Sequence, residues 1–128
     1  MTKVLIVDDA AFMRMQLKRI LERYEFDVVG EADNGFLALE LASSLKPDVI
    51  TLDITMPQMN GIECLEKINK LDDVPNVIMI SAMGQQACVI EAIEKGAKGF
   101  IVKPFKENDV MLQFNRIKKE YSRLQTEK

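Results

Sequence analysis

Five short apolar runs alternate with helical patterns along this chain. The runs lie at residues 4–7, 26–32, 49–52, 77–80 and 100–102. Each run is followed by a segment whose apolar residues recur at the spacing of a helix with one face on a core. A strand followed by a helix, repeated five times, is typical of an α/β fold with a parallel sheet.

The residues within the runs predict the order of the strands in that sheet. Runs 4–7, 49–52 and 77–80 are apolar on both faces, as strands covered by helices on both sides must be, whereas run 26–32 mixes apolar and acidic residues. The second strand should therefore lie at an edge, and right-handed crossovers then favour the order 2-1-3-4-5. We expect a flavodoxin-like, doubly wound five-stranded parallel sheet with five helices.

Size and charge exclude several classes of function. The 128 residues, 48% of them hydrophobic, are enough for one domain with a real core. A formal net charge of −3 argues against direct nucleic-acid binding, which needs a broad basic surface. No apolar stretch is long enough to span a bilayer, and the N-terminus lacks the pattern of a signal peptide. Cys64 and Cys88 have no nearby Cys or His partner, so we expect both to act as small buried or half-buried hydrophobic side chains. Free cysteines of this kind are typical of a protein in the reducing cytoplasm.

Acidic residues follow two of the apolar runs, where each predicted strand ends. Asp8 and Asp9 follow the first run, and Asp53 follows the third. The first and third strands are neighbours at the switch point of the predicted order, where open α/β sheets bind ligands. Three carboxylates at one sheet edge suit a hard divalent cation such as Mg²⁺. Each aspartate alone would also suit a helix cap, so it is their convergence that favours a metal site.

Two further polar residues follow the fourth and fifth predicted strands. Ser81 follows run 77–80, and Lys103 follows run 100–102. A hydroxyl and an ammonium facing a metal-bound carboxylate would form a site for a phosphoryl group, because the cations neutralise its oxygens and Ser81 donates a hydrogen bond. The sequence therefore predicts a phosphoryl site at the carboxyl edge of the sheet.

Together these residues form a motif that resembles a known family. The motif comprises Asp8-Asp9, Asp53 with Met56-Pro57, Met59 and Gly61 after it, Ser81-Ala82, and Lys103-Pro104-Phe105. In this order and spacing it resembles the receiver domain of two-component response regulators, and the stretch 81–86 is most similar to the stand-alone chemotaxis members. The resemblance implies a receiver domain over residues 1–120, followed by a charged helix end or tail over residues 121–128.

The resemblance implies roles for the acidic residues. Asp53 would be the phosphoacceptor, taking a phosphoryl group from a histidine kinase or a small phosphodonor. Asp8, Asp9 and Asp53 would hold Mg²⁺, together with the backbone carbonyl of Thr55. The chain would thus assist its own phosphorylation and dephosphorylation without being an enzyme that turns over a separate substrate.

It also implies how the protein responds to phosphorylation. Lys103, joined to Pro104 by a cis peptide bond, would contact the phosphoryl oxygens. Ser81 would move toward the new phosphoryl group, and Phe100 would rotate inward behind it. The fourth helix, fifth strand and fifth helix would then form the output surface.

The function implied is that of a phosphorylation-activated signalling protein in chemotaxis, acting on the flagellar motor. Its expected partners are a sensor histidine kinase, a flagellar switch protein or another output partner, and a phosphatase. We expect a cytoplasmic monomer. A single-domain phosphorelay intermediate, or the receiver of a larger transcriptional regulator, would fit the same motif.

Two other classes of protein place similar residues on α/β folds. A Mg²⁺-dependent phosphohydrolase could use Asp53 as its nucleophile, but haloacid-dehalogenase-type enzymes have an aspartate two positions later, where this chain has Thr55. A flavin or nucleotide carrier needs a glycine-rich or hydroxyl-rich loop after the first strand, whereas residues 8–12 begin with two acids. Both features favour a phosphoacceptor.

Overall fold

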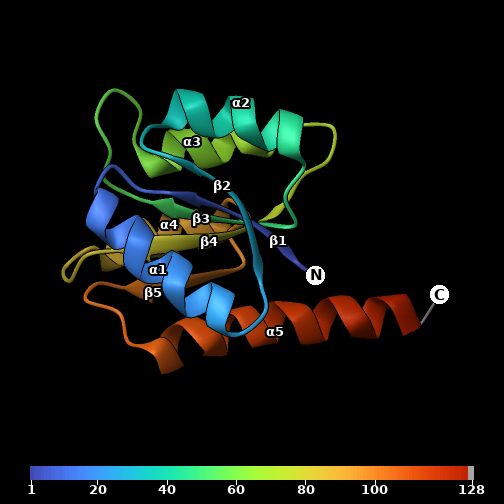
Figure 1. Ribbon diagram of the computed structural model, residues 1–128. Helices are drawn as coiled ribbons and strands as arrows, with labels where there is room; N and C mark the ends of the chain where they lie inside the picture. The colour runs from blue at the N-terminus through green and yellow to red at the C-terminus, as the bar shows by residue number, and fades with distance from the viewer. Residues whose placement is uncertain (127–128) are drawn as a thin grey trace.

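The computed structural model describes the backbone of residues 1–126 and the side chains of residues 1–118. Strands and helices alternate along the chain (Figure 1). The strands are β1 (Lys3–Val7), β2 (Asp27–Ala32), β3 (Val49–Asp53), β4 (Asn76–Ser81) and β5 (Gly99–Val102). The helices are α1 (Ala11–Arg23), α2 (Gly35–Leu45), α3 (Gly61–Ile68), α4 (Gln86–Glu94) and α5 (Glu107–Thr126). The predicted alternation is confirmed.

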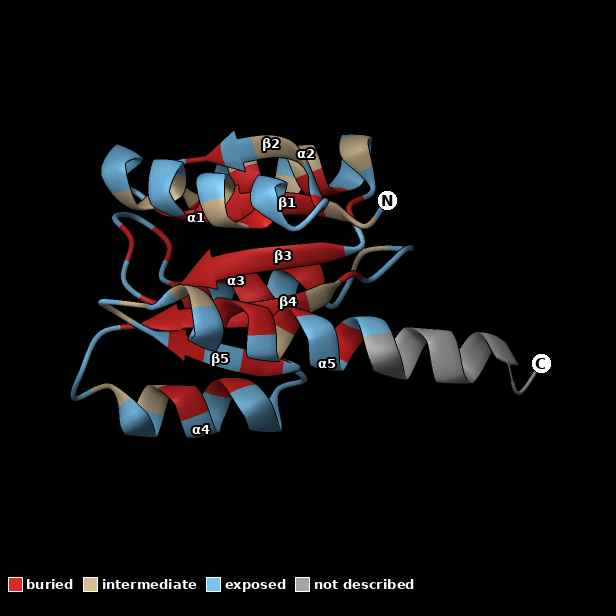
Figure 2. Ribbon diagram, turned by 60° about the horizontal axis from the view of Figure 1, so that its bottom comes forward, coloured by how far each residue is buried: buried red, intermediate tan, exposed pale blue. Residues whose placement is uncertain are grey.

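All the strands run parallel in the order β2-β1-β3-β4-β5, which confirms the predicted topology. Val7 pairs with Leu52 across β1 and β3, and Asp53 pairs with Ile80 across β3 and β4. The carboxyl ends of these three strands therefore meet at one edge of the sheet. Figure 2 shows β3 buried along its length, whereas the edge strand β2 mixes exposed and half-buried residues.

Helices cover both faces of the sheet. α2, α3 and α4 pack on one face, and α1 and α5 pack on the other (Figure 1). Adjacent residues of β1 contribute to opposite cores, since Leu5 packs with the first group of helices and Ile6 with the second. Both side chains are buried, and truncating either to alanine would cost about 2–5 kcal/mol. Burial on both faces explains why β1 shows no polar alternation.

The last helix extends beyond the region expected for the core of the domain. α5 continues to Thr126, so most of the segment predicted as a helix end or tail, 121–128, is helical, and residues 127–128 lie outside the described part. The domain boundary near residue 120 stays a prediction. Within residues 1–126, no helix combines the length and the apolar character needed to cross a bilayer.

Candidate functional site

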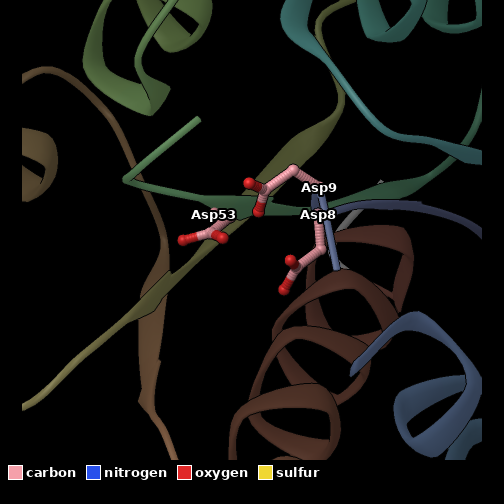
Figure 3. Close-up of side chains that lie close together, drawn as sticks. All are labelled: Asp8, Asp9 and Asp53. Carbon is pink, nitrogen blue, oxygen red and sulfur yellow. The ribbon is translucent and has the colours of Figure 1, made fainter. Parts of the chain in front are cut away.

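Three carboxylates gather at the carboxyl ends of β1 and β3 (Figure 3). One oxygen from each of Asp8, Asp9 and Asp53 lies within 4.8 Å of the others. Asp8 and Asp53 are only 4% and 5% exposed, whereas Asp9 is exposed. Buried carboxylates in such proximity repel one another unless cations lie between them. An all-oxygen donor set of this kind fits a hard divalent ion.

Lys103 supplies one positive charge to this cluster. Its Nζ lies 2.9 Å from Oδ2 of Asp8 and 3.1 Å from Oδ2 of Asp53. The lysine follows β5 directly, its peptide bond to Pro104 is cis, and its backbone N–H donates to the carbonyl of Ser81 at 2.7 Å. The ends of β4 and β5 are therefore joined, and the lysine side chain reaches the ends of β1 and β3.

Burial and charge set the protonation of the site. The pKa of Asp53 is raised to about 6, chiefly because burial disfavours its charged form and also because Asp8 lies nearby. Hydrogen bonds from Lys103 and from the Thr55 backbone partly oppose this rise in pKa. Burial alone would lower the pKa of Lys103, but its hydrogen bonds to Asp8 and Asp53 outweigh burial and raise it. Near pH 7 the lysine is therefore charged, and Asp53 is mostly the carboxylate that a nucleophile requires.

Backbone and arginine contacts orient the two buried aspartates. The N–H of Ala10 donates to Oδ1 of Asp8 at 2.9 Å, and the N–H of Thr55 donates to Oδ1 of Asp53 at 3.2 Å. Arg14 on α1 donates to the backbone carbonyl of Asp8 at 2.6 Å. Each buried carboxylate therefore keeps Oδ1 on the backbone and presents Oδ2 to Lys103. Sequence reasoning missed the contribution of Arg14, because no motif relates an arginine to a backbone carbonyl.

The chain after Asp53 folds back closely on the end of β3. The N–H of Gly61 donates to the carbonyl of Ile54 at 2.7 Å. A Cβ at Gly61 would lie 2.3 Å from the carbonyl oxygen of Asp53 and 2.7 Å from Cα of Ile54, both backbone atoms, so only glycine fits. Asn60 caps α3 by accepting from the N–H of Glu63 at 2.9 Å. The close approach of Gly61 to the backbone of Asp53 and Ile54 holds Asp53 against the start of α3.

The structure places the two residues with predicted switch roles at different depths. Ser81 ends β4 and is 1% exposed. Phe100 on β5 is 43% exposed and lines an apolar groove of about 620 Å³ between α4 and β5. Ile90 and Ile93 of α4 line the same groove and are also exposed. The inward rotation of Phe100 thus stays a prediction for the phosphorylated state.

Gln85 is a residue of the site that sequence reasoning did not assign. It lies between Gly84 and α4, and its carboxamide bonds both to Thr55 Oγ1, at 2.8 Å, and to the N–H of Ala82, at 2.7 Å. These partners lie in the loops after β3 and β4, two residues after Asp53 and one residue after Ser81. The only sequence signal was a glutamine a few residues after Ser81, which has no fixed meaning without the loop conformation.

Known proteins resemble this chain over most of its length. The family described as response regulator receiver domain matches residues 4–115. The chain is 56% identical over 117 residues to the chemotaxis protein CheY of Thermotoga maritima, covering 91% of this chain and 98% of that protein. It is 53% identical over 114 residues to the chemotaxis protein CheY of Bacillus subtilis, covering 89% and 95%. These matches confirm the resemblance that the motif indicated.

Solved structures agree with the sequence matches. The CheX-CheY-BeF3-Mg+2 complex from Borrelia burgdorferi contains a chain with a TM-score of 0.86 and 40% identity, covering 91% of this chain and 88% of that one. The response regulator domain of Thermotoga maritima CheB has a TM-score of 0.81 and 42% identity, covering 92% and 94%. The likeness in backbone therefore covers about the same share of the chain as the likeness in sequence.

Proposed function

Because this chain belongs to the response regulator receiver family, we propose that it is a chemotaxis signalling receiver in which Asp53 accepts the phosphoryl group. The relatives that are 56% and 53% identical to it are chemotaxis proteins, which supports this pathway. The observation that carries the site assignment is the convergence of Asp53 with Asp8, Asp9 and Lys103 at one edge of the sheet.

The proposed reaction is a phosphoryl transfer to a carboxylate. An oxygen of Asp53 attacks phosphorus and forms a P–O bond, while the bond from phosphorus to the donor breaks and its electron pair leaves with the donor. Lys103 contributes by charge and position, since its ammonium lies beside the nucleophile before the donor arrives. Oδ1 accepts from the backbone N–H of Thr55, and Oδ2, which lies beside the Lys103 ammonium, is the oxygen that we assign to the attack.

We propose that Asp8, Asp9, Asp53 and the backbone carbonyl of Thr55 hold Mg²⁺ in this site. The carboxylates lie close enough together to share one ion, and oxygen ligands are those Mg²⁺ prefers. When bound, the ion would neutralise oxygens of the transferring phosphoryl group. Asp9, the exposed member, has the freedom to adjust to the ion without repacking the core.

Phosphorylation would then shift the protein between two arrangements. The added phosphoryl group brings charge and strong acceptor oxygens, so an arrangement in which Ser81 and Lys103 donate to it gains population. Lys103 would exchange its contact with Asp8 for one with the phosphoryl group. Movement of Ser81 would open space behind it for Phe100, which now lies exposed beside the α4 groove. The face formed by α4, β5 and α5 is the proposed output surface.

We propose a sensor histidine kinase as the phosphodonor, a flagellar switch protein as the output partner, and a phosphatase that ends the signal, all in the cytoplasm. The names of the relatives support chemotaxis as the setting. Turnover of a separate phosphorylated substrate is disfavoured, because Thr55 stands where a hydrolase of the haloacid dehalogenase type has its second carboxylate. Residues 1–120 would be sufficient for the receiver function.

Labelling of the full chain tests the phosphoacceptor. We expect acetyl phosphate with Mg²⁺ to add one phosphoryl group to the wild-type protein, measured by intact mass spectrometry. The Asp53→Asn protein should show no added mass, and the Asp72→Asn protein should label like the wild type, because Asp72 is an exposed residue between α3 and β4. Undiminished labelling of Asp53→Asn would contradict the assignment.

A further inference from the structure

One glutamine side chain joins the loop that follows Asp53 to the loop that follows Ser81. Oε1 of Gln85 accepts from the backbone N–H of Ala82 at 2.7 Å, in the loop after β4. Nε2 of the same carboxamide donates to Oγ1 of Thr55 at 2.8 Å, in the loop after β3. Thr55 in turn donates its backbone N–H to Asp53, at 3.2 Å. A continuous set of hydrogen bonds therefore runs from the phosphoacceptor to the residue after Ser81.

The loop after β4 is a tight turn that Gln85 closes. The backbone N–H of Gln85 reaches the carbonyl of Ala82 at 3.4 Å, and Gly84 adopts a left-handed φ of +89°. The side chain thus adds a second link between the two ends of the turn. Met83, at the tip, is 80% exposed, so the contacts of Gln85 hold this loop rather than burial of its tip.

Helix capping does not explain the glutamine. Gln85 occupies the N-cap position of α4, where a side-chain oxygen ordinarily accepts from the first turn of the helix. Among the described residues no such capping bond is made, and the carboxamide turns back toward Ala82 and Thr55. The adjacent Gln86 begins α4 and is exposed. Position in the fold, rather than residue type, therefore distinguishes the two glutamines.

We propose that Gln85 is a positioning residue that latches the loop after Ser81 in the unphosphorylated arrangement. This inference rests on the proposed function, in which Ser81 moves toward a phosphoryl group on Asp53. Ala82 has a single N–H, and Gln85 occupies it, so this N–H can donate to a phosphoryl group on Asp53 only if its hydrogen bond to Gln85 breaks. The hydrogen bond therefore stabilises the unphosphorylated arrangement of the loop. Its loss on activation reduces the net free energy of binding a phosphoryl group or its analogue.

The size of the effect follows from the exposure of the two hydrogen bonds. Both are accessible to water, which replaces them in part once the loop has moved. Their loss should change the equilibrium between the two arrangements by about twofold to tenfold. Removal of the Gln85 side chain should therefore make the site more receptive, without the severe defect expected from removal of Asp53 or Lys103.

Beryllofluoride, a phosphoryl analogue, tests the latch when titrated with Mg²⁺ present and followed by amide NMR. The Gln85→Ala protein should bind it about twofold to tenfold more tightly than the wild type, and the control Gln86→Ala should bind like the wild type. Equal or weaker binding by Gln85→Ala would overturn the latch. If the affinity is equal and the phosphoryl group also lasts longer in Gln85→Ala, the role of Gln85 is to act on the attacking water instead of holding the loop.

A second measurement separates this inference from the proposed function. The temperature coefficient of the Ala82 amide proton is measured without any phosphodonor or metal. We expect it to change from that of a bonded amide to that of a solvent-exposed amide in Gln85→Ala alone; no change there would overturn the latch. If the wild type fails to bind beryllofluoride while the Ala82 amide still responds, the proposed function is wrong and the loop contact stands.

Discussion

The ammonium of Lys103 lies 3.1 Å from Oδ2 of Asp53, although the two residues are 50 positions apart. The same nitrogen lies 2.9 Å from Oδ2 of Asp8, so one ammonium contacts two buried carboxylates. This arrangement stabilises the negative charge that the proposed reaction needs, and it places a cation where phosphoryl oxygens would come to lie. The lysine is thus part of the resting site as well as of the response to phosphorylation.

Removal of the lysine charge should change the titration of Asp53. In Lys103→Met we expect the pKa of Asp53 to rise above its present value of about 6, because the lysine is the main group that opposes burial and Asp8. Carbon-13 NMR of the aspartate carboxyls in metal-free protein measures it. Lys106→Met serves as the control, because Lys106 is exposed and lies three residues further on. A pKa of Asp53 that stays the same would contradict the contact.

Asp53→Asn should stabilise the metal-free protein above pH 6. An unperturbed aspartate carboxyl has a pKa of 3.8, whereas the pKa of Asp53 in the fold is about 6, so the native state binds the proton more strongly. Wild-type stability should therefore fall as the pH rises from about 4 to 6, whereas the variant should not follow it. We expect a gain of about 1–2 kcal/mol at pH 7.5 that vanishes toward pH 4. Urea unfolding in EDTA measures this gain, and a less stable variant at pH 7.5 would contradict the account.

Asp9 offers a way to test the metal site without disturbing the core. Because Asp9 is exposed, Asp9→Ala should change the free energy of unfolding by less than about 0.5 kcal/mol. Its affinity for Mg²⁺ should nevertheless fall about tenfold or more, since one of three carboxylates is lost. Amide shifts during a Mg²⁺ titration report the affinity, and Asp33→Ala is a matched control at an exposed position after β2. Equal affinities in both variants would remove Asp9 from the metal site.

A side chain at Gly61 should strain the end of β3. A methyl group there would meet the backbone of Asp53 and Ile54, which cannot move without distorting the end of β3. We expect Gly61→Ala to lose about 1–3 kcal/mol of stability and to label more slowly with acetyl phosphate. Gly30→Ala should lose less, because its added methyl would meet the flexible side chain of Leu45 at 2.9 Å. Thermal denaturation compares the two, and an equal loss would contradict the close approach.

Much of the fold and of the acidic cluster was predictable, because each rests on a regular pattern. Strands buried on both faces must be continuously apolar, and this property alone separated β3 and β4 from the edge strand β2. Once the strand order is known, the ends of β1 and β3 must be neighbours, so Asp8 and Asp53 must lie close together. Local periodicity and the rules of sheet topology are sufficient for these conclusions.

The contacts around the cluster were not predictable, because they depend on loop conformation. The bond from Gln85 to Thr55 joins residues 30 positions apart in two irregular loops, and no spacing rule relates them. Helical spacing also did not predict which apolar residues of α4 are buried, since Val89 is buried whereas Ile90 is 59% exposed. A hydrophobic spacing does not distinguish a face that packs on the sheet from one that remains open to solvent.

A crystal structure of the wild-type protein with Mg²⁺ and beryllofluoride tests the central claim most directly. We expect beryllium on a carboxylate oxygen of Asp53, with Ser81 and Lys103 donating to the fluorines and Phe100 buried. Beryllofluoride bound away from Asp53, or bound there while Ser81 and Lys103 keep their present contacts and Phe100 stays exposed, would contradict the account.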